Sequence, residues 1–280
     1  MRGVRRTAGG RRGAGLKIVV ISLTRAVERR QRISADLERL GLDFELRDAI
    51  DGRNIPPEYE ALIDRAGSRR DGRVMRMGSI ANWLTQRQVL SDMVENGPEM
   101  MTVLEDDADF APEFPAVLDA LERTGTPFGI VFLHRGPRRR PFVPHVALET
   151  GHRLGWVRWS HFGSQGYTIT RQAARRFLEA NPLVRTGIDR ALARYWHHGQ
   201  TTYCLRPAVV LHRRETEGTP SLIREAPVVE WSDPLWRLRR GWFYGKEGVR
   251  KRVAFAGLAI RAFGPVKGAI QVLRPPGSFR

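Results

Sequence analysis

Three consecutive carboxylates, Glu105, Asp106 and Asp107, directly follow the apolar run at residues 100–104. Such a run predicts a buried strand, and in open parallel sheets ligands bind beyond the carboxyl ends of the strands. Adjacent carboxylates repel one another unless a cation neutralises them, and their oxygens are hard ligands that suit Mg²⁺ or Mn²⁺. The segment therefore predicts a divalent-cation site that would also bind a diphosphate. A solvated acidic turn or a helix N-cap is the alternative that the spacing leaves open.

The histidines and the single cysteine offer little other chemistry. His212, at the end of the last predicted strand, is either a metal ligand or a structural histidine. The adjacent His197 and His198 are expected at the surface. Cys204 excludes a disulfide framework and multi-cysteine metal sites, and its apolar neighbours predict a buried structural thiol.

The acidic segment must be positioned by the elements around it, and their order predicts an α/β fold. A strand at 17–23, a helix at 28–40 and a strand at 44–46 form a βαβ unit, which is typical of a parallel sheet. Further strands are predicted at 100–104, 128–133, 166–170 and 208–212, and further helices at 79–96 and after residue 170.

Charge divides the 280 residues into three parts. The net charge is +17, of which a basic leader at residues 1–15 carries +5 and a tail at residues 235–280 carries +10. The body at residues 16–234 is left near neutral, at +2. An excess of positive charge predicts an anionic partner, and here that prediction applies to the ends of the chain. The leader is expected to be disordered, and no stretch approaches the about 20 apolar residues of a membrane span.

The tail predicts a basic helix with aromatic residues among its charges. Its apolar residues Val249, Val253, Ala256, Ile260 and Phe263 share one helical stripe. Arginines and lysines attract anionic lipid, and Trp and Tyr favour the membrane interface. We therefore expect a membrane-surface anchor, and a solvated helix packed on the body is the alternative.

Three blocks of residues occur in a specific order along the first two-thirds of the chain. They comprise Ser22-Leu23, Glu28-Arg29 and Ala49-Ile50-Asp51-Gly52; then Gly78, Ile80 and Leu104-Glu105-Asp106-Asp107; then Gly163, Gly166, Tyr167, Ile169, Thr170 and Ala173. In this combination the chain resembles glycosyltransferase family 25. That family contains lipopolysaccharide and lipooligosaccharide galactosyltransferases and the collagen galactosyltransferases.

The resemblance implies a GT-A type transferase domain over residues 16–234, with a Rossmann-like mixed sheet, helices on both faces and a basic C-terminal helical tail. It implies inverting transfer of a hexose, typically galactose from UDP-galactose, onto a lipopolysaccharide-type or other glycan acceptor. Mn²⁺ or Mg²⁺ would be held by Asp107 with Glu105 and His212, and Asp189 is the candidate base, with a helix N-cap as its alternative role. The candidate donor-binding residues are Ser22, Leu23, Arg25, Arg29, Asp51, Gly52, Gln86 and Asp106.

Departures from the family pattern keep other functions in view, and one is Ser79, which stands where the family has an acidic residue after glycine. Thr85-Gln86 stands where the family has Ser-His, and Ser22 stands where it has Asn. A glutamine exchanges hydrogen bonds but cannot act as an acid or base at neutral pH, so a non-catalytic relative that binds a nucleotide sugar or glycan is the first alternative. A nucleic-acid-binding protein is the second, and the acidic cluster argues against it. If the chain is a transferase, we expect a bacterial protein of the cytoplasm that is peripherally bound to the inner membrane. Its acceptor would be a lipid-linked or other glycan used in synthesis of the cell envelope, and we expect no nucleic-acid partner.

Overall fold

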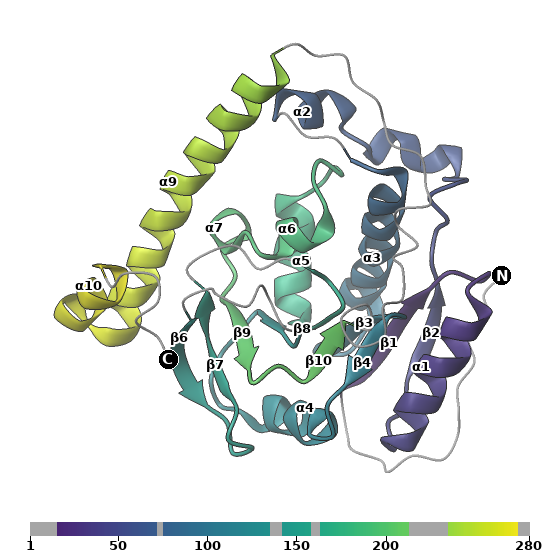
Figure 1. Ribbon diagram of the computed structural model, residues 1–280, viewed down its shortest axis with the longest axis horizontal. Coiled ribbons are helices and arrows are strands. Elements are labelled where there is room, and N and C mark those ends of the chain that lie inside the picture. Colours follow the sequence, from purple (N-terminus) through teal and green to yellow (C-terminus); the bar gives the residue numbers. More distant parts are fainter. Residues whose placement is uncertain (1–15, 72–74, 135–141, 158–162, 213–234, 274–280) are drawn as a thin grey trace.

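The computed structural model describes residues 16–71, 75–134, 142–157, 163–212 and 235–273 (Figure 1). The expected leader at 1–15 and the end of the expected transferase domain at 213–234 lie outside the described residues. The described strands form an eight-stranded mixed sheet in the order β2-β1-β3-β8-β5-β9-β7-β6 and a separate two-stranded ribbon of β10 and β4. The strands are β1 (Lys17–Ser22), β2 (Glu45–Asp48), β3 (Met100–Glu105), β4 (Ala108–Phe110), β5 (Ile130–Phe132), β6 (Phe142–Ala147), β7 (Arg153–Val157), β8 (Gly166–Thr170), β9 (Thr202–Arg206) and β10 (Val210–His212).

The predicted βαβ unit is confirmed. Strand β1 pairs in parallel with β2 on one side and with β3 on the other. In this register Ser22 lies opposite Asp48, and Ile21 lies opposite Glu105. The carboxyl ends of the three strands therefore meet at one edge of the sheet, and the acidic segment leaves the sheet beside the loop that follows β1.

Helices cover both faces of the sheet, as expected. Alternate residues of β1 serve two cores, because Val19 and Ile21 belong to one buried cluster, and Ile18 and Val20 to the other. Helices α3, α5 and α6 pack on the first face, and α1 and α4 on the second. The helices of the body are α1 (Val27–Arg39), α2 (Arg65–Arg70), α3 (Met77–Asn96), α4 (Phe114–Arg123), α5 (Arg171–Ala180), α6 (Ile188–Leu192) and α7 (Tyr195–His198), with a 3-10 turn at Pro57–Leu62.

The second half of the sheet differs from the sequence prediction. The predicted last strand at 208–212 is β10, and it pairs antiparallel with β4 outside the main sheet. The last strand along the chain in the main sheet is β9, which contains Cys204 and pairs in parallel with β5. The hairpin of β6 and β7 extends the sheet beyond β9. Cys204 is buried as expected, and burial raises the pKa of its thiol to about 12.

The tail forms α9 (Trp236–Phe263) and α10 (Pro265–Leu273), and α9 runs along one side of the body (Figure 1). Its buried residues Glu247, Lys251, Phe255 and Ala259 recur every four positions, which places them on one side of the helix. Glu247 accepts a hydrogen bond from Arg194 Nε at 2.7 Å and so joins the middle of α9 to the body. The predicted helical tail is therefore observed.

The outward face of α9 carries a line of exposed apolar side chains. Leu238, Trp242, Val249 and Val253 are 72%, 71%, 61% and 68% exposed. Their intervals of four and seven residues keep them on one stripe. Of the predicted stripe, Phe263 instead faces the body, where it makes edge contacts with the rings of His145 and Trp156 on the β6–β7 hairpin. None of the described helices is long and apolar enough to cross a membrane.

Candidate active site

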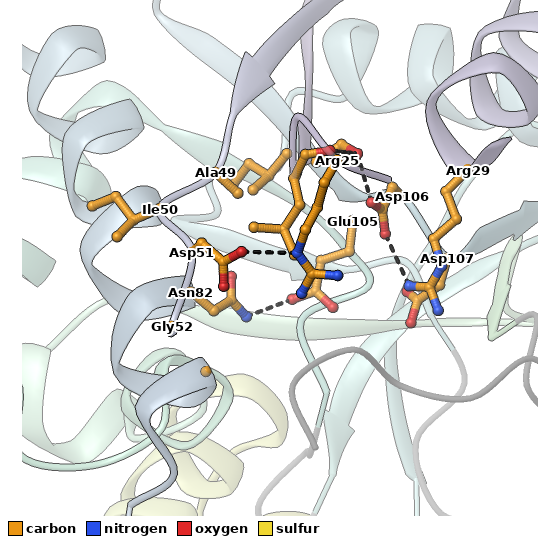
Figure 2. A pocket seen from close by; sticks show the side chains of 14 residues that line it. Arg25, Arg29, Ala49, Ile50, Asp51, Gly52, Asn82, Glu105, Asp106 and Asp107 are labelled. Atoms are coloured by element: carbon orange, nitrogen blue, oxygen red, sulfur yellow. Dashed lines mark hydrogen bonds and ion pairs between the residues drawn. The ribbon is translucent and has the colours of Figure 1, made fainter. Parts of the chain in front are cut away.

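A pocket opens where β1, β2 and β3 end and α3 begins (Figure 2). The ends of the three parallel strands and the first turn of α3 together form a crevice at this edge of the sheet. The pocket contains the three predicted carboxylates and two arginines of the loop and helix that follow β1. Its lining residues are Ile21, Ser22, Leu23, Arg25, Arg29, Ala49, Ile50, Asp51, Gly52, Gly78, Asn82, Glu105, Asp106 and Asp107. Most of the residues predicted to bind the donor are thus brought together.

The three carboxylates point in different directions, which separates their charges. Asp106 accepts hydrogen bonds from Ser22 Oγ at 2.6 Å and from Arg29 at 3.3 Å (Figure 2). Glu105 accepts from Asn82 Nδ2 at 2.9 Å on its Oε1 atom. Burial raises the pKa of both Glu105 and Asp106, and the charge of Asp107 raises that of Glu105 further. A cation bound near these three carboxylates would be favourable, because it would neutralise negative charge on side chains that are partly shielded from water.

Asp107 lies beside His212, the histidine singled out by the sequence. Their nearest atoms, Oδ2 and Nε2, are 3.4 Å apart. The β4–β10 ribbon produces this contact, because His212 pairs with Ala108, the residue after Asp107. The second oxygen of Asp107, Oδ1, is buried and has no hydrogen-bond partner among the described residues.

Asp107 thus has one oxygen without a partner among the described residues, and its other oxygen lies beside an imidazole nitrogen; carboxylate and imidazole together suit a divalent cation such as Mn²⁺. Among the described residues no group of three or more His, Cys, Asp or Glu side chains surrounds a common point. Glu105, the third predicted ligand, is instead engaged by Asn82 and Ser164. The chain thus offers Asp107 and His212 as a pair, and a bound diphosphate would have to supply further ligands.

Asp51 and Gly52 form the rim of the pocket after β2. Arg25 donates to Asp51 at 2.8 Å across the mouth (Figure 2). Burial raises the pKa of Asp51, but hydrogen bonds from the Arg53 backbone and from the side chains of Arg25 and Arg53 outweigh it and lower the pKa to about 2. Gly52 is required by close approach, since a Cβ there would lie 2.6 Å from the backbone of Gly78 at the start of α3.

Asp189 does not line the pocket and is connected to Glu105 indirectly, through Gly163 and Ser164. Its Oδ2 accepts a hydrogen bond from the Gly163 backbone N–H at 3.2 Å. The next residue, Ser164, donates to Glu105 Oε1 at 2.5 Å. Asp189 is not the N-cap of its helix, because Gly187 occupies that position in α6. The N-cap interpretation of Asp189 is therefore wrong.

Gln86 takes a different place from the one predicted. It is fully buried in α3 and does not line the pocket. It lies one turn behind Asn82, which does line the pocket and which the sequence analysis missed. The i, i+4 spacing of these two amides on a predicted helix was the available signal. Ser164 was also missed, although it stands inside the Gly163–Gly166 block.

Comparison with known proteins identifies relatives of this chain. Residues 16–192 match the family model described as glycosyltransferase family 25 (LPS biosynthesis protein). A glycosyltransferase 25 family member of Aedes aegypti is 32% identical over 178 residues, which are 59% of this chain and 28% of that protein. Human procollagen galactosyltransferase 2 is 24% identical over 59% of this chain and 28% of its own length. The bovine probable inactive glycosyltransferase 25 family member 3 is 26% identical over 60% of this chain and 29% of its own length.

Two solved structures align with this chain at lower identity. A mutant of Drosophila beta-1,4-galactosyltransferase 7, in complex with manganese, UDP-Gal and xylobiose, aligns with a TM-score of 0.41 at 9% identity. The alignment covers 81% of this chain and 80% of that chain. A glycosyltransferase involved in glycosylation of the major capsid of PBCV-1 aligns with a TM-score of 0.36 at 11% identity, covering 82% of this chain and 99% of that chain. The chain spans under a third of the length of the curated relatives described above.

Proposed function

Because this chain belongs to glycosyltransferase family 25, we propose that it transfers a hexose, in the first instance galactose from UDP-galactose, onto a lipopolysaccharide-type or other glycan acceptor. The observation that carries the proposal is the pocket at the ends of β1, β2 and β3, in which arginines and carboxylates face each other. A nucleoside diphosphate needs cations for its phosphates and acceptors for its ribose hydroxyls. The pocket supplies both.

The two arginines of the pocket suit the diphosphate. Arg25 and Arg29 lie at the carboxyl end of β1, where Asp51 and Asp106 hold their side chains in place. A guanidinium group has five N–H donors in a fixed fork, which suits it to bind phosphate oxygens. Asp51 and Asp106 thus position the arginines, and the backbone from Ala49 to Gly52 provides the wall on the β2 side.

We assign Asp107 and His212 as the residues that would hold Mn²⁺ or Mg²⁺. The support is the partnerless Oδ1 of Asp107 and the distance of 3.4 Å between the two side chains. When bound, the ion would neutralise negative charge on the departing UDP. Glu105, which its neighbours already engage, would contact the donor or the ion from the opposite side of the acidic segment.

Asp189 is the proposed base. Its carboxylate is half-buried and held by the Gly163 N–H, and the Gly163–Ser164 step joins it to Glu105. The acceptor hydroxyl oxygen would form a bond to the anomeric carbon while the bond from that carbon to the UDP oxygen breaks, and Asp189 would take the hydroxyl proton. Attack from the face opposite the leaving UDP inverts the configuration at the anomeric carbon.

We further propose that α9 holds the enzyme against an anionic membrane surface, on the cytoplasmic side of a bacterial inner membrane, where a lipid-linked acceptor would be available. The exposed stripe of Leu238, Trp242, Val249 and Val253 supports this. Arg239, with its neighbours along α9 that include Lys246 and Arg250, adds positive charge beside the stripe. Apolar insertion and attraction to anionic headgroups together favour an interfacial position.

A donor screen tests the proposed function. The purified chain is incubated with Mn²⁺ and a panel of UDP-hexoses, and mass spectrometry follows consumption of the sugar and release of UDP. We expect turnover of UDP-galactose. UDP binding by calorimetry without turnover of any donor would favour the non-catalytic alternative, to which the relationship with a probable inactive bovine protein gives weight. Absence of both binding and turnover would reject the assignment.

A further inference from the structure

A chain of side-chain hydrogen bonds runs from the buried core of the sheet to the pocket. Tyr167 Oη donates to Gln86 Oε1 at 2.8 Å, and Gln86 Nε2 donates to Asn82 Oδ1 at 3.0 Å. Asn82 Nδ2 then donates to Glu105 Oε1 at 2.9 Å. We propose that Tyr167 and Gln86 are positioning residues that orient Asn82 and Glu105 for binding of the UDP part of the donor. This inference rests on the proposed function.

The direction of the chain follows from the chemistry of its two ends. A carboxylate only accepts hydrogen bonds, so Asn82 must turn its NH₂ group toward Glu105 and its oxygen toward Gln86. Gln86 must then present its NH₂ group to Asn82 and its oxygen to Tyr167. Tyr167 stays protonated, because burial and the charge of Glu105 raise the pKa of its hydroxyl. Each amide therefore has one orientation that satisfies both neighbours.

The members of the chain divide into two that touch the pocket and two that do not. Asn82 and Glu105 line the pocket, whereas Gln86 and Tyr167 are fully buried behind it. Asn82 and Gln86 stand four residues apart on α3, on the same face of the helix. Tyr167 lies on β8 opposite Val103 of β3 and so reaches the strand that ends at Glu105. The buried pair can affect a ligand only through Asn82 and Glu105.

Glu105 is held from more than one side on a single oxygen. Ser164 Oγ donates to Oε1 at 2.5 Å, and Gln86 Nε2 lies 3.5 Å from the same atom. Several donors on one oxygen fix the plane of the carboxylate and hence the place of the other oxygen. Without Gln86 or the Tyr167 hydroxyl, Asn82 would keep its hydrogen bond to Glu105 but lose the support behind it, so the amide and the carboxylate would be free to shift together.

Two variants test the chain, and a third provides the control. Gln86→Met keeps the volume without the amide, and Tyr167→Phe removes only the hydroxyl. Thr168→Val removes a buried hydrogen bond of the same sheet, the 2.8 Å contact between Thr102 and Thr168, which does not reach the pocket. Calorimetry measures binding of UDP in the presence of Mn²⁺, and thermal unfolding reports the folded state of each variant.

We expect Gln86→Met and Tyr167→Phe each to weaken UDP binding by up to about tenfold, the order expected for the loss of one neutral hydrogen bond that holds Asn82 and Glu105 in place. The double variant should be no weaker than Gln86→Met alone, because both changes break one chain. Thr168→Val should lower thermal stability and leave UDP affinity unchanged. Unchanged affinity in the folded Tyr167→Phe variant, an equal loss in Thr168→Val, or additive losses in the double variant would overturn the proposal.

A second measurement separates this proposal from the proposed function. Nuclear magnetic resonance of the Asn82 side-chain amide, assigned through Asn82→Asp, reports its orientation without any ligand. The resonance should shift in Tyr167→Phe and stay in place in Thr168→Val. If the wild-type chain binds no UDP, the proposed function fails while the amide resonance still decides whether the hydrogen-bond chain exists. An unshifted resonance in Tyr167→Phe would refute the chain itself.

Discussion

The outward stripe of α9 gives a quantitative prediction about membrane binding. We expect the triple variant Leu238→Ser, Trp242→Ser, Val253→Ser to lose binding to vesicles that contain phosphatidylglycerol. These side chains are 72%, 71% and 68% exposed. Complete burial of a large apolar side chain is worth roughly 1.5–3 kcal/mol. Two-thirds exposure therefore leaves about 1–2 kcal/mol for each to gain in the membrane interface.

The three substitutions together should remove about 3 kcal/mol or more of membrane affinity, which corresponds to roughly a hundredfold weaker partitioning. Vesicle co-sedimentation measures this directly. The matched control is Val27→Ser with Leu183→Ser, since both residues are exposed apolar side chains of the body, at 55% and 42%. Equal sedimentation of the triple variant and the wild type would refute the apolar part of the argument.

The basic residues beside the stripe make a second, separable contribution. Each arginine or lysine near an anionic leaflet is worth about 1 kcal/mol, so Arg239→Gln, Lys246→Gln and Arg250→Gln together should weaken binding to anionic vesicles by about a hundredfold. Binding to neutral phosphatidylcholine vesicles should change little, and high salt should mimic the substitutions. Undiminished binding of the charge variant to anionic vesicles would show that electrostatics do not hold the tail there.

Three further predictions concern the body and its junction with the tail. Burial lowers the pKa of His198 to about 4 from its ordinary 6.5, so below pH 6.5 the unfolded chain binds a proton that the folded chain does not. The free energy of unfolding should therefore fall by about 3 kcal/mol between pH 6.5 and 4. In His198→Gln, chemical denaturation should show a smaller decrease in the free energy of unfolding over the same pH range. Gly52→Ala would place a Cβ 2.6 Å from the backbone of Gly78, so we expect UDP binding to weaken at least tenfold in calorimetry. Glu247→Ala would leave Arg194, only 15% exposed, without its carboxylate; it should cost about 2 kcal/mol and speed hydrogen exchange in α9.

Controls for these changes are present in the same chain. Gly125→Ala meets no atom within 4 Å, so UDP affinity should be unaffected. Glu149→Ala breaks an exposed ion pair with Arg123, which should cost little. If the free energy of unfolding depends on pH in the same way in His198→Gln and in the wild type, His198 is not the cause of the lower stability in acid.

The parts of the fold that were predicted correctly are those in which a local pattern decides the outcome. The β-branched run of β1 can be satisfied only by burial on both faces, and the apolar residues of β3 lead directly to the carboxylates. Both strands were placed within one or two residues. The position of the pocket followed, because parallel strands bring their carboxyl ends to one edge.

The parts that were not predicted depend on distant partners. His198 was expected at the surface, yet it is only 5% exposed, because its Nε2 lies 3.0 Å from the Leu192 carbonyl oxygen and its ring packs on Phe177. Apolar and polar residues alternate only weakly in the β6–β7 hairpin. The hairpin depends instead on the pairing of β7 with β9, which lies far from it in sequence. Asn82 and Ser164 became recognisable as site residues only once the fold brought α3, Glu105 and the start of β8 together.

The tail shows how two alternatives from the sequence can coexist. One face of α9 packs on the body through Glu247, Lys251 and Phe255, which is the packed-helix interpretation. The opposite face exposes Trp242 and Val253, which is what a membrane anchor requires. Sequence periodicity placed Val249 and Val253 on the stripe but did not extend it to Leu238 and Trp242, and the buried positions of the helix show which side is exposed.

Release of UDP from UDP-galactose in the presence of Mn²⁺, compared among the wild type, Asp107→Ala and Asp109→Ala, tests whether the pocket is a metal-assisted donor site. Asp109 is the matched control, because it lies two residues further along the same acidic segment and does not line the pocket. We predict that the wild type and Asp109→Ala release UDP at similar rates and that Asp107→Ala is slower by about a hundredfold or more. Equal rates in the wild type and Asp107→Ala would contradict the account of this pocket as a metal-assisted donor site.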